Sequence, residues 1–302
     1  MHKTKPIDIT PFKHLYPFES HFARINGFRY HYVDEGRGEP VVMIHGNPTW
    51  SFYFRNMILG LSSRYRTIAM DHIGCGLSDK PPLRAYDYTL KRRIEDVSRF
   101  LQELDLKDKM TLVVHDWGGM IGAAYALEHL ERIHRLIVMN TAAFFPPAGK
   151  RLPLRLQVIR RSRLFSSFAV LGLNLFARGA LLMASHRKLP PDVKSGLIAP
   201  YNCRRHRIAT WMFVRDIPLS PGDASYATVK RVDENLHRLS SIPMLICWGL
   251  QDFVFDADYL AEWQKRFPNA TVQAYSNAGH YVLEDVPEKI IDSSLKFMLT
   301  KQ

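Results

Sequence analysis

The sequence of 302 residues has only three cysteines, Cys75, Cys203 and Cys247. They are an odd and widely scattered set without zinc-ligand spacing, so reduced thiols in a cytoplasmic protein are the better interpretation. The N-terminus lacks the apolar core of about 7–15 residues that marks a signal peptide. No stretch reaches the roughly 18 uninterrupted apolar residues of a membrane span. These absences point to an ordinary globular enzyme or binding protein.

Acidic residues are almost missing from residues 146–218, where Asp192 and Asp216 stand against fourteen lysines and arginines. This segment therefore carries a net charge of +12, and the rest of the chain is neutral. The charge can simply keep the surface soluble, or it can bind an acidic partner protein or an anionic membrane. Nucleic acid is not expected as a partner, because no recognised binding motif accompanies the charge.

Short apolar runs alternate with helical stretches through most of the chain, after a predicted hairpin at residues 20–35 that turns at Asn26-Gly27. This alternation predicts a mostly parallel sheet with helices on both faces. Residues 146–218 break it, because they contain helical stretches and no strand-like run. We therefore expect an α/β core, residues 1–145 and 219–302, interrupted by a helical cap. The expected core strands are residues 40–44, 65–71, 110–114, 133–140, 242–249 and 271–275.

The motif His-Asp-Trp-Gly-Gly at residues 115–119 lies between the strand at 110–114 and an alanine-rich helix at 120–129. Strand, tight turn and helix are the context of a nucleophile elbow, where the turn lifts one side chain above the sheet edge. Here that residue is Asp116, whose carboxylate can attack carbon and form an ester with a substrate. Alternatively, Asp116 only caps the following helix.

Two further residues complete a triad in the chain order nucleophile, acid, histidine. Asp252 follows the strand at 242–249, and His280 follows the last strand. An imidazole near Asp116 could deprotonate a water that attacks the ester, while Asp252 would fix its tautomer and stabilise the imidazolium. Each residue is a weak signal alone, since loops often carry His and Asp, but three ordered groups at three strand ends make a catalytic site the favoured hypothesis.

With these motifs the chain resembles the α/β-hydrolase superfamily and, within it, the haloalkane dehalogenase-like group. The resemblance includes the motif His-Gly-Asn-Pro-Thr at residues 45–49, and it implies an α/β-hydrolase fold with an inserted helical cap. It also implies that Asn47 and Trp117 donate N–H bonds to a departing halide, with their backbone N–H groups lining the oxyanion hole. Trp117 could instead be an aromatic plug under the cap.

Neighbouring families fit less well. Epoxide hydrolases usually carry an aromatic residue at the position of Asn47 and use two cap tyrosines, whereas residues 146–218 hold only Tyr201. Fluoroacetate dehalogenases usually carry Arg at the position of Trp117. One dehalogenase subgroup takes its acid from a Glu after the strand that here ends at Asn140, so in this chain the acid is expected to be Asp252.

Within the group, the chain is most similar to the β-lactone decarboxylases of bacterial long-chain olefin biosynthesis, in weaker segments such as residues 139–144 and 199–201. This resemblance implies conversion of cis-β-lactones with two long alkyl chains to cis-olefins, without cofactor or metal. It also implies a hydrophobic substrate and an assembly with other enzymes of the olefin pathway, at or near the membrane. Together with the thiols and the charge described above, this predicts a cytoplasmic location with possible peripheral membrane contact through the basic cap. Haloalkane hydrolysis is the alternative, and a non-catalytic scaffold that docks partners is the alternative of another class.

The apolar residues of the helical stretch 164–177, with more at 181–183, suit alkyl chains, which are held by apolar area alone. Apolar residues at helical spacing more often mean packing of a cap on its core, so a substrate channel and ordinary packing both remain open.

Overall fold

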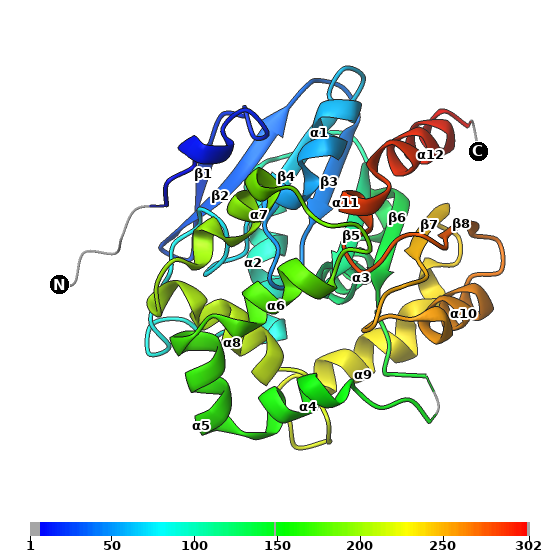
Figure 1. The fold of residues 1–302 in the computed structure, drawn as a ribbon. Coiled ribbons are helices and arrows are strands. Elements are labelled where there is room, and N and C mark those ends of the chain that lie inside the picture. The colour runs from blue at the N-terminus through cyan, green and yellow to red at the C-terminus, as the bar shows by residue number, and fades with distance from the viewer. Residues whose placement is uncertain (1–6, 148, 301–302) are drawn as a thin grey trace.

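One eight-stranded sheet organises the computed structural model, which describes residues 7–147 and 149–300 (Figure 1). The strand order is β1-β2-β4-β3-β5-β6-β7-β8. Strands β1, β2 and β4 pair antiparallel, and all neighbours from β4 to β8 pair in parallel. The strands are β1 (His21–Ile25), β2 (Phe28–Glu35), β3 (Pro40–Ile44), β4 (Arg66–Met70), β5 (Met110–Asp116), β6 (Ile133–Thr141), β7 (Met244–Gly249) and β8 (Thr271–Tyr275).

The α/β-hydrolase architecture expected from the sequence is thus present. The predicted hairpin forms between β1 and β2, where Asn26 and Gly27 both adopt positive φ, of 50° and 86°. Positive φ at both central residues gives the turn whose twist matches that of the strands. Residues 1–6 lie outside the described residues. The prediction that the N-terminus is no signal peptide therefore stays a prediction.

Strand β5 lies between β3 and β6, and all seven of its residues are buried. Most of its residues between Met110 and Val114 are apolar, because neither side-chain row of a strand covered on both faces meets water. Two large apolar clusters, one on each face of the sheet, hold it in place. The carboxyl end of β5 is therefore a rigid platform for the residue that follows the apolar run.

Helices cover both faces of the sheet (Figure 1). Helix α2 begins where the Thr89 side chain accepts a hydrogen bond from the Arg92 backbone N–H, the usual geometry of an N-cap. The helices of the core are α1 (Arg55–Leu61), α2 (Leu90–Glu103), α3 (Trp117–Glu128), α9 (Tyr226–Asn235), α10 (Ala257–Arg266), α11 (Val282–Asp285) and α12 (Pro287–Leu299).

Between β6 and α9 the chain forms the cap, and its described residues contain helices but no strand. In Figure 1, α4, α5, α6 and α8 lie together in the lower half of the molecule, with α5 at its lower left. The cap boundaries at residues 146 and 218 stay a prediction. The cap helices are α4 (Leu154–Arg161), α5 (Arg163–Ser166), the π-helical segment η4 (Ser167–Gly172), α6 (Leu175–Met183), α7 (Pro191–Ile198) and α8 (Ile208–Arg215).

The prediction of one continuous helical stretch at residues 164–177 is wrong, because the helix is interrupted. The chain leaves the helix after Gly172 and starts again at Leu175, because Asn174 adopts a left-handed conformation with φ 57°. The Asn174 side chain donates a hydrogen bond to the carbonyl of Tyr201, which holds the break in place. Apolar periodicity gave no sign of this break, since an asparagine that tolerates positive φ interrupts it at one position only.

Candidate active site

Asp116 occupies the sharp turn between β5 and α3. Its backbone has φ 52° and ψ −126°, a conformation that L-residues rarely adopt and that is typical of a nucleophile elbow. Gly46 and Gly118 make the turn possible, since a Cβ at Gly118 would strike the carbonyl of Ile44 and one at Gly46 would strike the Asp116 carboxylate. The Asp116 side chain makes no capping bond to α3. The structure therefore has the geometry of an elbow and not that of a helix cap.

The Asp116 carboxylate is almost fully buried and is held by backbone donors. Its Oδ2 accepts a hydrogen bond of 2.6 Å from the backbone N–H of Asn47, and the backbone N–H of Trp117 also donates to the carboxylate. Burial raises the pKa of Asp116, although His280 and the two N–H groups oppose the rise. The paired N–H groups are the donors expected of an oxyanion hole.

His280 lies on the other side of the carboxylate. Its Nε2 is 3.9 Å from Oδ1 of Asp116, and its Nδ1 is 2.8 Å from Oδ2 of Asp252. Because an ionised carboxylate can only accept, Nδ1 carries the proton and donates to Asp252. Burial alone would lower the pKa of His280, but the Asp252 and Asp116 carboxylates outweigh it and raise the pKa. The structure thus brings the three predicted triad residues together in an order suited to proton transfer.

The Asp252 carboxylate is itself held by its own loop and by the end of β6. Its Oδ1 accepts the backbone N–H of Val254, and its Oδ2 accepts a hydrogen bond of 3.0 Å from the Asn140 amide. Asn140 also bridges to the backbone of Gly249, with one bond donated and one accepted. The amide at the end of β6 therefore positions the acid that follows β7.

His115 supports the catalytic histidine from the preceding position in the elbow motif. Its Nε2 is 2.8 Å from the backbone carbonyl of His280, to which it donates. Burial and the neighbouring His280 lower the pKa of His115 well below its usual value, so the ring is neutral. A neutral ring that donates through Nε2 carries no proton on Nδ1. The Nδ1 atom of His115 is buried and has no hydrogen-bond partner among the described residues, so no N–H donor is left unpaired there. His115 therefore helps to fix the loop that carries His280.

The side chains of Asn47 and Trp117 lie under the cap. The Asn47 amide donates a hydrogen bond of 3.2 Å to the backbone carbonyl of Thr210 in α8, while its Oδ1 is buried without a partner. The Trp117 ring lies 5.5 Å from the ring of Phe213, also in α8. Within the described chain no acceptor faces the Trp117 indole N–H. The structure thus places both predicted donors at the boundary of core and cap, with the Asn47 amide engaged by the cap.

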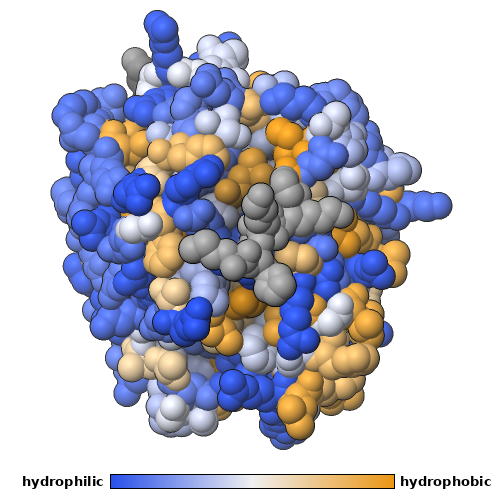
Figure 2. Space-filling view, turned by 90° about the vertical axis from the view of Figure 1, so that its left-hand side faces the viewer, coloured by the Kyte–Doolittle hydropathy of each residue, from blue (hydrophilic) through white to orange (hydrophobic). Residues whose placement is uncertain are grey.

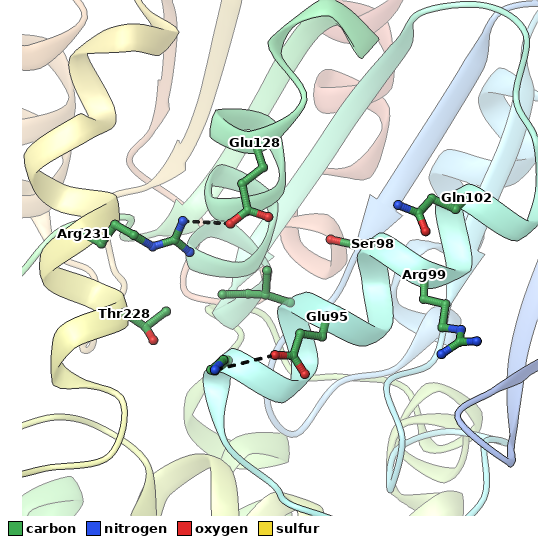
Figure 3. A pocket seen from close by; sticks show the side chains of 9 residues that line it. Glu95, Ser98, Arg99, Gln102, Glu128, Thr228 and Arg231 are labelled. Carbon is green, nitrogen blue, oxygen red and sulfur yellow. Dashed lines mark hydrogen bonds and ion pairs between the residues drawn. The ribbon is translucent and has the colours of Figure 1, made fainter.

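A separate groove of about 420 Å³ lies between α2 and α9, away from the triad (Figure 3). Four of its charged side chains are paired: Arg231 with Glu128 at 2.7 Å, and Lys91 with Glu95 at 4.0 Å. Nothing in this groove resembles a nucleophile held by a base. Within the described parts of the chain, no group of three or more His, Cys, Asp or Glu side chains could hold a metal ion.

Sequence reasoning missed the residues that support the triad. Asn140 stood out only as a strand end, and His115 only as part of the elbow motif. Thr210 gave no signal, because it contacts Asn47 through a backbone carbonyl that any residue could provide. The position of His115, next to the nucleophile on a strand with two buried faces, could have predicted a buried supporting role.

Comparison with known proteins agrees with this geometry. Residues 39–287 match the family model described as the alpha/beta hydrolase fold. The chain belongs to the α/β-hydrolase family. Within the family it is 47% identical, over 94% of its length and 89% of the relative's, to a protein named cis-3-alkyl-4-alkyloxetan-2-one decarboxylase from Shewanella oneidensis. It is also 36% identical to a haloalkane dehalogenase from Mycobacterium marinum, over 89% of this chain and 90% of that one.

Among solved structures, the haloalkane dehalogenase DatA from Agrobacterium tumefaciens superposes with a TM-score of 0.83, at 24% identity and with coverage of 93% of this chain and 96% of that one. At this identity the likeness speaks for the fold alone. The expected membership in the dehalogenase-like group of α/β-hydrolases is confirmed by the sequence relatives.

Proposed function

We propose that this protein decarboxylates cis-β-lactones with two long alkyl chains to cis-olefins, with Asp116 as the covalent nucleophile. The observation that carries the proposal is the similarity to a cis-3-alkyl-4-alkyloxetan-2-one decarboxylase over nearly the whole chain, at 47% identity against 36% for a haloalkane dehalogenase. The triad geometry supports an enzyme with an Asp nucleophile. The names of both relatives are compatible with such an enzyme.

The reaction can be followed bond by bond. Oδ1 of Asp116, the oxygen free of the Asn47 N–H, attacks the ring carbon that carries the ring oxygen. That carbon–oxygen bond breaks, and its electron pair leaves on the substrate carboxylate. The bond between this carboxylate and the second ring carbon then breaks, and its electrons form the alkene. The ester bond to Asp116 breaks at the same time, so carbon dioxide leaves and Asp116 recovers its electron pair without any water or proton being consumed.

The opened lactone carries a carboxylate that needs N–H donors as its charge develops. Trp117 can provide one, since an indole N–H only donates and faces no acceptor within the described residues. Asn47 can provide the other, because its amide nitrogen carries two N–H bonds and only one is engaged, by the Thr210 carbonyl.

Haloalkane hydrolysis is the second candidate, and the placement of His280 favours it. The 3.9 Å between its Nε2 and Oδ1 of Asp116 fits a histidine that activates a water beside the ester. In that reaction the halide departs for good, so only hydrolysis can release the product and regenerate Asp116. The two reactions therefore differ in the fate of the same ester.

Product analysis separates the two reactions. We expect the purified protein to convert a cis-dialkyl β-lactone to cis-alkene and carbon dioxide, with no solvent oxygen in the alkene when the water is isotopically labelled. A bromoalkane of matched chain length should react slowly or not at all. Efficient release of bromide and alcohol, with the lactone untouched or merely opened to a hydroxy acid, would assign the protein to the dehalogenases. Failure of both substrates would support the non-catalytic scaffold.

The proposal includes a cytoplasmic location. The three cysteines are free thiols in the structure, which fits a reducing compartment such as the cytoplasm. A substrate with two long alkyl chains dissolves poorly in water, so direct transfer from the enzymes that make the lactone would serve this step. We therefore include an assembly with the other enzymes of the olefin pathway. Co-purification of those enzymes with the tagged protein is the expected result, and its absence under mild lysis would remove the assembly from the proposal.

A further inference from the structure

The cap exposes large apolar side chains on three consecutive segments, α5, η4 and α6. Leu164 and Phe168, one helical turn apart, are 87% and 63% exposed. Leu182 is 77% exposed and lies seven residues after Leu175, so that both occupy the same side of α6. We call this set the cap apolar face; its members are Leu164, Phe165, Phe168, Leu173, Leu175 and Leu182.

The inner side of the same segments is apolar as well. Val170 and Leu171 are buried against Trp211 of α8. A helix that is apolar on every side is normally covered on every side, and large exposed apolar surfaces mark sites of interaction. Figure 2 shows the side of the molecule on which α5 lies in Figure 1, and hydrophobic side chains gather at its lower right among strongly hydrophilic ones.

The geometry favours a surface contact over a membrane span. No helix in the described parts of the chain is alone long and apolar enough to cross a bilayer. Arg163–Gly172 and Leu175–Met183 pass that test only when taken together, and they are bent by 72° at the break between them. Straightening the pair would pull Val170 and Leu171 away from Trp211. A bent pair with one packed side can lie on a membrane with its free side inserted.

Free positive charge adjoins this face. Arg163 directly precedes Leu164, Arg161 lies two residues before Arg163, and Arg178 lies in α6. All three are exposed without an ion pair to any described residue. Other cap cations are engaged, such as Arg160 by Asp223 and Lys150 by Asp256 and Asp258. The whole segment 146–218 has a net charge of +12. Basic side chains beside inserted apolar ones are what an anionic lipid surface attracts.

We propose that the cap apolar face docks this protein onto a bilayer that contains anionic phospholipids. Its Leu and Phe side chains enter the boundary between head groups and acyl chains, and Arg161, Arg163 and Arg178 bind the phosphates. A second copy of the chain is a poor occupant, because two caps of charge +12 would face each other. The proposal concerns binding and holds for either candidate reaction.

Flotation of the full-length protein with vesicles tests the proposal. We expect binding to vesicles of phosphatidylcholine mixed with phosphatidylglycerol, weak binding to phosphatidylcholine alone, and a decline as salt rises, because exposed charges are screened over about 10 Å at 0.1 M. Leu164→Ser with Phe168→Ser should weaken binding at least about tenfold through lost apolar area. Arg161→Glu with Arg163→Glu should do the same, at about 1 kcal/mol for each charge near the surface.

Matched controls lie at the opposite end of the molecule (Figure 1). Leu59→Ser in α1 replaces one leucine that is 53% exposed, and Lys289→Glu with Lys296→Glu in α12 reverses two charges, both away from the cap. Leu164→Ser alone is the cap variant to compare with Leu59→Ser. The controls should bind vesicles like the unmodified protein, and every variant should keep its turnover of substrate dispersed in detergent. Equal binding by cap variants and controls would overturn the proposal. So would an unmodified protein that ignores anionic vesicles at low salt, or that forms dimers which the cap variants lose.

Discussion

The core and the cap of this protein differ in how they bury their side chains and in the charge that they carry. Every residue of β5 is buried, and the charged groups at its end are held by N–H donors and by each other. In the cap, α4 buries none of its residues, and Leu164 and Phe165 of α5 and Phe168 of η4 face outward. The core is neutral overall, whereas the cap carries the whole net charge. The core thus fixes a few atoms precisely, whereas the cap leaves large apolar side chains exposed beside its positive charge, which is the basis of the docking that we propose.

The largest effect should come from the core. Asp116→Ala removes the proposed covalent nucleophile, so turnover of β-lactone and of bromoalkane should both fall to background, because loss of the nucleophile removes the reaction pathway itself. The fold should survive, since the carboxylate stabilises no secondary-structure element by capping. Steady-state assays and a circular dichroism spectrum measure the two outcomes. Ordinary activity in a pure Asp116→Ala preparation would refute the covalent mechanism for either substrate.

His280→Ala should sharpen the distinction between the two reactions. Hydrolysis of an ester on Asp116 needs a base, so bromide release should stop after one turnover, with a lasting adduct on Asp116 that mass spectrometry detects; loss of a general base costs about 10²–10⁴ in rate. Decarboxylation transfers no proton, so alkene formation should fall less. Asp252→Ala is the matched variant, because it leaves the imidazole in place without its partner. Equal losses for both substrates would show that His280 has the same role in both reactions.

The smallest effects concern stability and compare the two regions directly. Leu112→Ala in the middle of β5 should lower the free energy of unfolding by about 2–5 kcal/mol, because it leaves a cavity in a closely packed core. Leu164→Ala in the cap should change it by less than about 0.5 kcal/mol, since the side chain is exposed. Urea denaturation measures both. A large loss from Leu164→Ala would mean that the cap apolar face contributes to the fold rather than to an outside contact.

The sequence predicts the core better than the cap, for physical reasons. Alternating apolar runs and strand-end residues were enough to anticipate the sheet and to choose Asp116, Asp252 and His280. These signals are local, because the period of a strand and the chain order of a triad can be read along the chain. The break at Asn174 and the contact of the Asn47 amide with Thr210, 163 residues away, depend on how the cap settles on the core. No local pattern carries that information.

Helix α8 contacts both the active site and the outer part of the cap. On its inner side, the carbonyl of Thr210 holds the Asn47 amide; on its outer side, the neighbouring Trp211 indole donates a hydrogen bond of 2.8 Å to the Ser166 hydroxyl of α5. The outer surface of the cap and the Asn47 amide are therefore connected by two hydrogen bonds through neighbouring residues of one helix. A movement of α5 that displaces Trp211 would also move the Thr210 carbonyl, and with it the amide that we propose as a donor to the leaving group.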